Sequence, residues 1–162
     1  MSQFMTSLKT HWKSLVILLL ITLGGGAIIG FLTRSSMEFY NTLNRPAFAP
    51  PGWLFPIVWG ILYTLMAIAI WLVMRAEASG RTRLLVLYFV QLAVNLLWPI
   101  LFFIQQTLGL AFVWLMLLWV LIILLLTGCA RISKVSAWLL TPYLLWTTFA
   151  AVLNFSIALM NP

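Results

Sequence analysis

The chain has 162 residues, of which 64% are hydrophobic and 7% charged, and its mean hydropathy is +1.12. A soluble domain carries roughly 25% charged residues, so a fold this apolar needs lipid as its solvent. The net charge of +7 does not indicate nucleic-acid binding, because the cations are few and scattered, and the single cysteine excludes both an internal disulfide and a multi-cysteine metal site.

Apolar segments long enough to cross a bilayer recur along the chain, since each crossing needs roughly 20 apolar residues. The first segment follows Lys9 and Lys13 as in a signal peptide, but it continues apolar through Gly30 without a clear cleavage site, so we expect a retained helix. Gly26 and Gly30 are spaced to admit the close approach of another helix of the same chain. The sequence predicts one domain over 1–162, an all-α five-transmembrane-helix bundle with helices at about 12–32, 53–74, 84–104, 108–129 and 135–160.

The connections between these segments differ in length and charge. Residues 33–52 form the longest polar connection, and its prolines and Gly52 make it rich in turns. If the N-terminus is cytoplasmic, Arg34 and Arg45 are the only two Lys or Arg residues expected outside, and the sequence obeys the positive-inside rule. The C-terminus and the connection 33–52 are then expected outside, and His11 is expected at the surface. The cations inside would be Lys9, Lys13, Arg75, Arg81, Arg83, Arg131 and Lys134.

No ionisable residue lies well inside any predicted span, which disfavours ion pumps, proton-coupled carriers and voltage sensors. The buried polar residues are neutral. Helical spacing puts Gln91, Asn95 and Trp98 on one face, and Trp59 and Tyr63 on another. A third face carries Pro142, Trp146, Ala150 and Asn154. The amides either bond neighbouring helices or, with the aromatic rings, line a pocket for a flat apolar ligand; composition leaves both interpretations open.

Three sequence blocks together resemble one known family. They are Arg45-Pro-Ala-Phe-Ala-Pro-Pro-Gly-Trp-Leu-Phe-Pro-Ile-Val-Trp-Gly-Ile-Leu-Tyr63, the stretch from Gln91 to Phe103, and the stretch from Pro142 to Asn154. Their order and spacing are similar to those of the translocator protein family, also called TspO/MBR or tryptophan-rich sensory protein. The resemblance covers about residues 30–155, and the nine tryptophans agree with the family name.

The resemblance implies a five-helix bundle, often a homodimer, that binds porphyrins such as protoporphyrin IX and haem as ligands and requires no cofactor. It also implies that Trp59 and Trp146 match the tryptophans linked to light-dependent porphyrin degradation in bacterial members. The pocket would open under the lid loop 33–52. Its implied walls are Tyr40, Trp59, Tyr63, Gln91, Asn95, Trp98, Trp146, Phe149, Ala150 and Asn154.

Two positions depart from the family pattern. Phe48 stands where the family has a tryptophan before the Pro-Pro pair, so an aromatic plate remains without an indole N–H donor. Phe155 stands where animal members have the tyrosine of their cholesterol motif, and no cation follows it. We therefore expect no cholesterol site of that type, and we expect a bacterial cell membrane as the location.

The leading functional hypothesis is a membrane protein that binds tetrapyrroles and has a sensory or regulatory role. Aromatic rings would stack on the macrocycle, while its propionates would point to the loop and pair with Arg34 and Arg45. One alternative is an enzyme that degrades porphyrin under light, and another is a passive porphyrin transporter. The sequence carries no nucleophile–base pair, so it does not favour hydrolytic chemistry.

Overall fold

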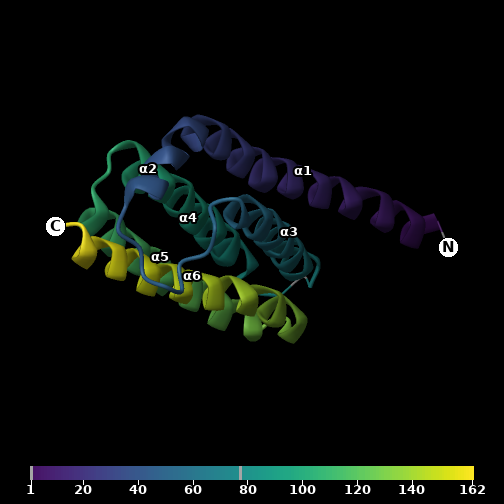
Figure 1. Ribbon diagram of the computed structural model, residues 1–162. Helices are drawn as coiled ribbons and strands as arrows, with labels where there is room; N and C mark the ends of the chain where they lie inside the picture. The colour runs from purple at the N-terminus through teal and green to yellow at the C-terminus, as the bar shows by residue number, and fades with distance from the viewer. Residues whose placement is uncertain (1, 77) are drawn as a thin grey trace.

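The computed structural model describes residues 2–76 and 78–162, with side chains described from residue 12 onward. Every regular element in these ranges is helical (Figure 1). They are α1 (Ser2–Thr33), the 3-10 turn η1 (Arg34–Ser36), α2 (Met37–Thr42), α3 (Leu54–Arg75), α4 (Arg81–Pro99), the π-helical turn η2 (Ile100–Ile104), α5 (Leu108–Ala130) and α6 (Lys134–Met160).

Among the described residues, five helical segments are long and apolar enough to cross a membrane, which confirms the expected all-α five-helix fold. The protein is thus a multi-pass membrane protein. Lipid offers no hydrogen-bond partners, so each span must satisfy its backbone internally, and only a helix does this within one segment. The spans are Trp12–Thr42, Leu54–Arg75, Arg81–Ile104, Leu108–Ala130 and Lys134–Met160.

The sequence suggested a loop over the whole of residues 33–52, but the structure has helical turns in its first part. Its first part is helical, because η1 and α2 carry the chain on to Thr42 almost without interruption. Helix α2 ends at Thr42, where Leu43 is already extended, and Pro46 then keeps the helix from resuming. The lid, defined here as residues 34–53, is therefore half helix and half turns. Helix α1 also begins at Ser2, well before residue 12, and the predicted position of His11 falls outside the described side chains.

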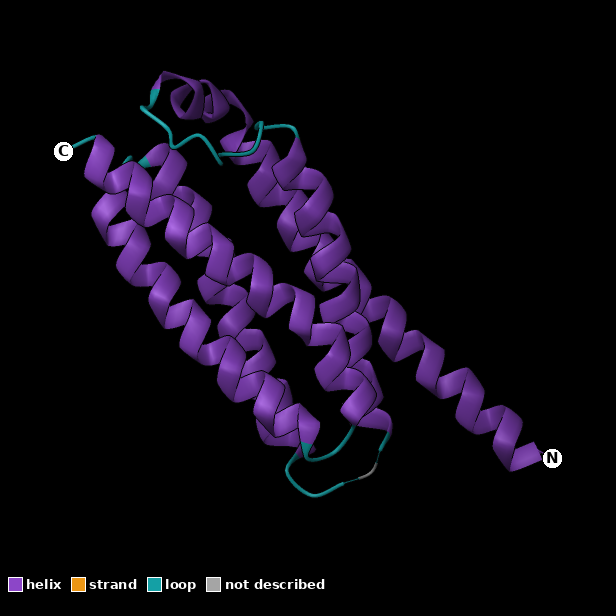
Figure 2. Ribbon diagram, turned by 60° about the horizontal axis from the view of Figure 1, so that its bottom comes forward, coloured by secondary structure: helices purple, strands orange, loops and turns teal. Residues whose placement is uncertain are grey.

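The bundle core lies among α3, α4, α5 and α6. Helix α6 packs against α5 and α3, and α4 packs against α5. Residues such as Met66, Ile70, Leu115 and Leu118 are fully buried where these helices meet. Helix α1 packs mainly against α3 and also contacts α4 and η2, and its N-terminal half extends beyond the other helices (Figure 2). The C-terminal half of α1 therefore lies beside the bundle, against α3 and α4.

Pro99 shapes the end of the third span. Proline has no backbone N–H and its ring crowds the preceding turn, so the regular α-helical pattern ends there. One π turn follows, closed by the backbone bond from Gln105 N to Ile100 O at 2.9 Å. This wider turn carries Phe103 beside Trp98 at the lid end of the bundle, with ring centroids 6.1 Å apart.

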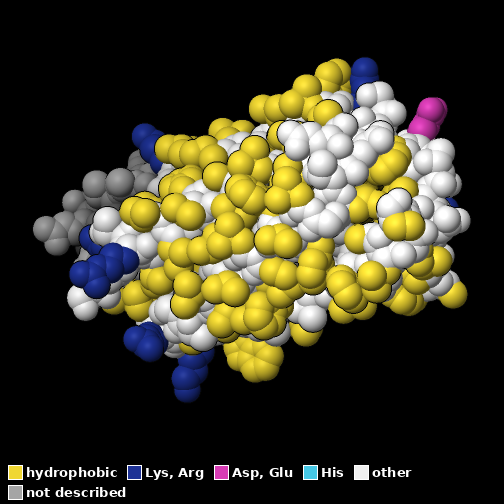
Figure 3. Space-filling view, turned by 90° about the vertical axis from the view of Figure 1, so that its left-hand side faces the viewer, with side chains coloured by type: hydrophobic (Ala, Val, Ile, Leu, Met, Phe, Trp, Pro, Cys, Tyr) yellow, Lys and Arg dark blue, Asp and Glu magenta, His cyan; other side chains and the backbone are white. Residues whose placement is uncertain are grey.

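The surface of the protein is mostly apolar. The face seen in Figure 3 is covered by hydrophobic side chains, while most of its Lys and Arg side chains gather at one end. The α3–α4 connection, in which residue 77 is not described, and the α5–α6 connection lie at that end. Arg34 and Arg45 lie in the lid at the opposite end of the bundle. Trp53 and Trp138, near opposite ends of the bundle, are 66% and 74% exposed, as anchors at a membrane interface would be.

Candidate functional site

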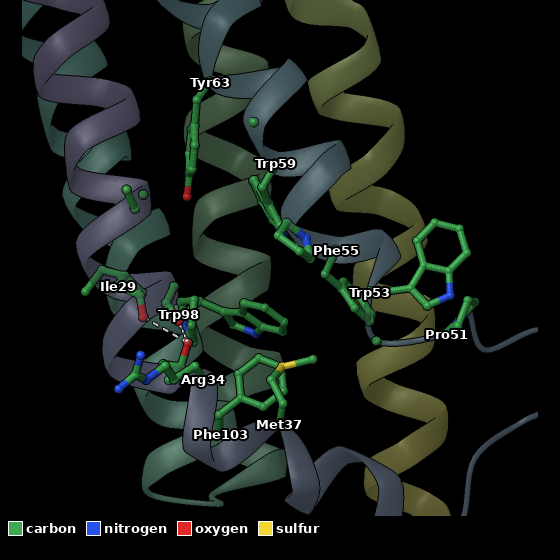
Figure 4. A pocket seen from close by; sticks show the side chains of 18 of the residues that line it. Ile29, Arg34, Met37, Pro51, Trp53, Phe55, Trp59, Tyr63, Trp98 and Phe103 are labelled. Carbon is green, nitrogen blue, oxygen red and sulfur yellow. Dashed lines mark hydrogen bonds between the residues drawn. The ribbon is translucent and has the colours of Figure 1, made fainter.

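A cavity of about 1030 Å³ opens between α1, the lid, the first half of α3 and the end of α4. Helix α1 contributes its small residues Gly26, Ala27 and Gly30, and α3 contributes aromatic side chains. The lid forms the roof and contributes Met37 and Arg34, seen in Figure 4, and also Arg45. The cavity lies at the end of the bundle where the chain is least regular.

Aromatic rings form the wall opposite α1. Phe55, Trp59 and Tyr63 are spaced by four residues on α3, so helical periodicity turns all three toward the cavity. The rings of Trp59 and Tyr63 lie 5.5 Å apart and are inclined by only 31°. Trp98 and Phe103 line the lid end of the cavity, near Met37 and Arg34 (Figure 4). Such a set of ring faces suits a flat ligand that is held mainly by stacking and less by hydrogen bonds.

The glycines of α1 make room for side chains and for the cavity. The ring of Tyr63 occupies the space that a Cβ on Gly26 would need, whereas a Cβ on Gly30 would meet no atom within 4 Å. Gly30 borders the cavity instead. The expected packing against another helix of the same chain is found at Gly26, which meets Tyr63 of α3, and not at Gly30. Because Gly26 has no side chain, the Tyr63 ring can pack against the backbone of α1. Because Gly30 has none, the space beside it stays part of the cavity.

Two arginines stand at the lid end of the cavity. Arg34 lies over the ring of Phe31, 4.0 Å from its centroid, and Arg45 lies over the ring of Tyr40 at 4.6 Å. Both also line the cavity. A ring face engages the plane of a guanidinium and not its edge N–H groups, unlike a carboxylate, which takes a pair of them. The mouth of the cavity is therefore cationic, while its walls are apolar.

The structure brings together only part of the predicted pocket. Trp59, Tyr63, Trp98, Arg34 and Arg45 all line the cavity. The remaining predicted wall residues lie outside it, and they do so in two groups. The group under the lid, on the α6 side, consists of Tyr40, Trp146, Phe149, Ala150 and Asn154. The group deeper in the bundle consists of Gln91 and Asn95.

The group under the lid is separated from the cavity by Phe55. The Phe55 ring meets Tyr40 edge-on at 5.4 Å and Trp146 at 6.1 Å. Phe149 packs on Trp146 at 5.3 Å and meets Phe48, the residue that replaces the family tryptophan, at 6.3 Å. Of the two tryptophans linked by resemblance to porphyrin degradation, Trp59 faces the cavity and Trp146 does not.

A small hollow lies next to the cavity on the α6 side. It is bordered by Tyr40, Ala150 and Asn154, and it shares Phe55 and Trp98 with the cavity. Asn154 accepts a bond from Trp98 Nε1 at 3.1 Å and donates to Leu108 O at 2.9 Å. These bonds fix the Trp98 ring as a partition, so the hollow and the cavity remain separate in this structure.

The deeper amides form what we call the polar seam, made of Tyr63, Gln91, Asn95 and Tyr143. The Tyr63 hydroxyl donates to Asn95 Oδ1 at 2.8 Å, and Asn95 Nδ2 donates to the Tyr143 hydroxyl at 2.7 Å. The Tyr143 hydroxyl in turn donates to Gln91 Oε1 at 2.8 Å. Of the seam's described side-chain atoms, Gln91 Nε2 is buried without a partner. The seam ties α3, α4 and α6 together, so its amides serve helix packing.

Sequence reasoning missed several residues of the cavity. Phe55, Phe103 and the glycines of α1 were not among the predicted walls, although the four-residue spacing of Phe55, Trp59 and Tyr63 was a usable signal.

Within the described residues, no cluster of His, Cys, Asp and Glu could hold a metal ion. The lining contains neither His nor Cys; of the residue types that ligate haem iron it holds Met37 and Tyr63, and the Tyr63 hydroxyl is bonded to Asn95. The cavity is thus built for stacking and charge pairing.

Comparison with known proteins agrees with the motifs. The model of the TspO/MBR family matches residues 16–160. The tryptophan-rich protein TspO of Chlorobaculum tepidum is 39% identical over 134 residues, which cover 82% of this chain and 85% of that protein. The tryptophan-rich sensory protein of Cereibacter sphaeroides is 34% identical over 91% of this chain and 92% of its own. The translocator protein of Homo sapiens is 34% identical over 82% and 81% of the two chains.

Proposed function

The chain belongs to the TspO/MBR family, and on this basis we propose that it is a membrane protein that binds a tetrapyrrole, protoporphyrin IX or haem. The observation that carries the proposal is a cavity with aromatic walls and two arginines at its mouth. Ligand pockets have volumes of roughly 300–1,000 Å³, and the cavity of about 1030 Å³ stands at the upper end, as a macrocycle requires.

The chemistry of the lining fits an amphipathic, flat and anionic molecule. The macrocycle would stack on the rings of α3, chiefly Trp59, and would use the space left by Gly30. Its two propionates would turn to the lid, where Arg34 and Arg45 offer charge-assisted hydrogen bonds. The Tyr63 and Trp98 donors are engaged by Asn95 and Asn154, so affinity would come from stacking and the two cations.

A sensory or regulatory role is the second part of the proposal. The printed name of the relative from Cereibacter sphaeroides, a tryptophan-rich sensory protein, supports it. Porphyrin would enter from the membrane, contact the lid and α1 together, and so couple its own presence to the position of the lid. We further propose a cytoplasmic N-terminus, an outward lid and a homodimer in a bacterial cell membrane, for which the segregation of cations supports the orientation.

Two glycine variants on α1 test the binding proposal with a matched control. Gly30→Leu places a side chain in the cavity from a position where a Cβ meets no atom within 4 Å, while Gly24→Leu adds the same side chain on the same helix away from the cavity. Protoporphyrin IX is titrated into detergent-solubilised protein and followed by its absorbance shift. We expect Gly30→Leu to weaken binding by at least about tenfold, and Gly24→Leu to bind as the native protein does. Equal affinity in all three proteins would refute the assignment of this cavity.

A further inference from the structure

The irregular half of the lid is fastened to the rest of the protein at its first residues. Asn44 is the second residue after α2, and its backbone N–H and C=O both bond to one side chain, that of Asn161. Asn44 N donates to Asn161 Oδ1 at 3.0 Å, and Asn161 Nδ2 donates to Asn44 O at 2.9 Å. One amide side chain thus satisfies both backbone groups of one lid residue, as a neighbouring β-strand would.

Asn161 is itself held in place. It follows the last helical residue of α6, and its Nδ2 also donates to Ile157 O at 2.8 Å, one of the carbonyls left open at the helix end. The reverse contact, from Asn44 Nδ2 to Met160 O, is longer at 3.5 Å. The two positions are therefore unequal, because the bonds need the side chain of Asn161 but only the backbone of Asn44.

The next lid residue is Arg45, whose guanidinium lines the cavity and lies over Tyr40. Tyr40 in turn donates its hydroxyl proton to Pro50 O at 3.0 Å, which fastens the far side of the same turn region. Between these two anchors the chain has little freedom, and Arg45 extends from the anchored end. The direction of its side chain at the mouth depends on where the Asn44 backbone is held.

We propose that Asn161 is a positioning residue of the binding site: it clamps the lid at Asn44 and thereby presents Arg45 to an anionic group of the ligand. The part that concerns the ligand rests on the proposed function, whereas the clamp itself does not. Loss of the clamp releases the lid after Thr42, and Arg45 then samples directions away from the cavity. The protein would lose preference for an acidic ligand over a neutral one of the same shape.

The variant Asn161→Ala removes both bonds, and Asn44→Ala keeps them because they use the backbone, so the second serves as its matched control. Hydrogen exchange of residues 43–53 measures the clamp without ligand. We expect the backbone amide of residue 44 to exchange at least about fivefold faster in Asn161→Ala than in the native protein. In Asn44→Ala we expect the same protection of this amide as in the native protein. Native exchange in Asn161→Ala overturns the clamp.

Binding of protoporphyrin IX and of its dimethyl ester measures the positioning role, since only the free acid offers carboxylates to Arg45. We expect the native protein and Asn44→Ala to prefer the acid by roughly tenfold, and Asn161→Ala to lose most of this preference while still binding the ester. An unchanged preference in Asn161→Ala, or none in the native protein, overturns the positioning role. If neither porphyrin binds the native protein, the proposed function fails and the exchange result alone decides the clamp.

Discussion

The polar seam and the cavity share the side chain of Tyr63, yet they use polar chemistry in opposite ways. In the seam, hydroxyls and amides from α3, α4 and α6 bond to one another deep in the bundle. In the cavity, ring faces are left open and the cations stand at the rim. A polar group inside a membrane protein is costly unless it is paired. The paired amides therefore hold the helices together, and the groups available to a ligand lie where the lid meets the cavity.

The largest effect expected from this contrast is on the seam. Asn95→Ala leaves the hydroxyls of Tyr63 and Tyr143 without the amide that joins them. Each buried group that loses its partner costs roughly 1–3 kcal/mol, so we expect a loss of about 3 kcal/mol in unfolding free energy. Unfolding in mixed detergent micelles measures it. Asn41→Ala, in the lid, is the control and should be near native; native stability of Asn95→Ala would contradict a structural seam.

A slightly smaller effect is expected where the seam and the cavity meet. Gly26→Ala places a methyl group where the Tyr63 ring now lies, and the ring must move toward the cavity. Overpacking costs roughly 1–3 kcal/mol, so we expect about 2 kcal/mol lower stability together with weaker porphyrin binding. In a Tyr63→Ala background the same change should cost nothing further, as a double-mutant cycle would show. Full additivity of the two changes would refute the contact.

The cations of the lid should affect binding without affecting stability. Replacing Arg34 and Arg45 together by Gln removes both charges at the cavity mouth, while the apolar walls stay intact. We expect protoporphyrin IX to bind roughly tenfold more weakly, its dimethyl ester to bind equally well, and the melting temperature to stay the same. Isothermal calorimetry and thermal unfolding would show the two results. Equal losses for acid and ester would mean that the arginines do not pair with carboxylates.

The smallest effect distinguishes the two tryptophans. Trp59→Phe shortens a ring that lines the cavity, whereas Trp146→Phe alters a ring behind Phe55. We expect about threefold weaker binding for the first and native binding for the second, because only Trp59 can contact a ligand there. Absorbance titration is the suitable measurement, since both variants change the intrinsic fluorescence. A larger loss in Trp146→Phe would move the ligand to the α6 side of Phe55.

Part of the site could be predicted from the sequence. The spacing of Trp59 and Tyr63 on one helix face, and the position of Arg34 and Arg45 after the first span, placed these residues correctly at one end of the bundle. The amides Gln91, Asn95 and Asn154 could not be assigned, because an amide has the same hydrogen-bonding groups whether its partner is a ligand or another helix. Only the rotation of α4 and α6 about their axes decides which partner is reached.

The sequence by itself determined the spans, because hydrophobicity and backbone hydrogen bonding act within a segment and lipid leaves a helix as the available conformation. It also determined the placement of cations near segment ends. The tertiary structure decided the rest. It set Gly26 against Tyr63, drew the amides into the seam, placed Trp146 behind Phe55, and brought Asn161 to Asn44. Each of these depends on how one helix lies against another, a property that no single segment carries.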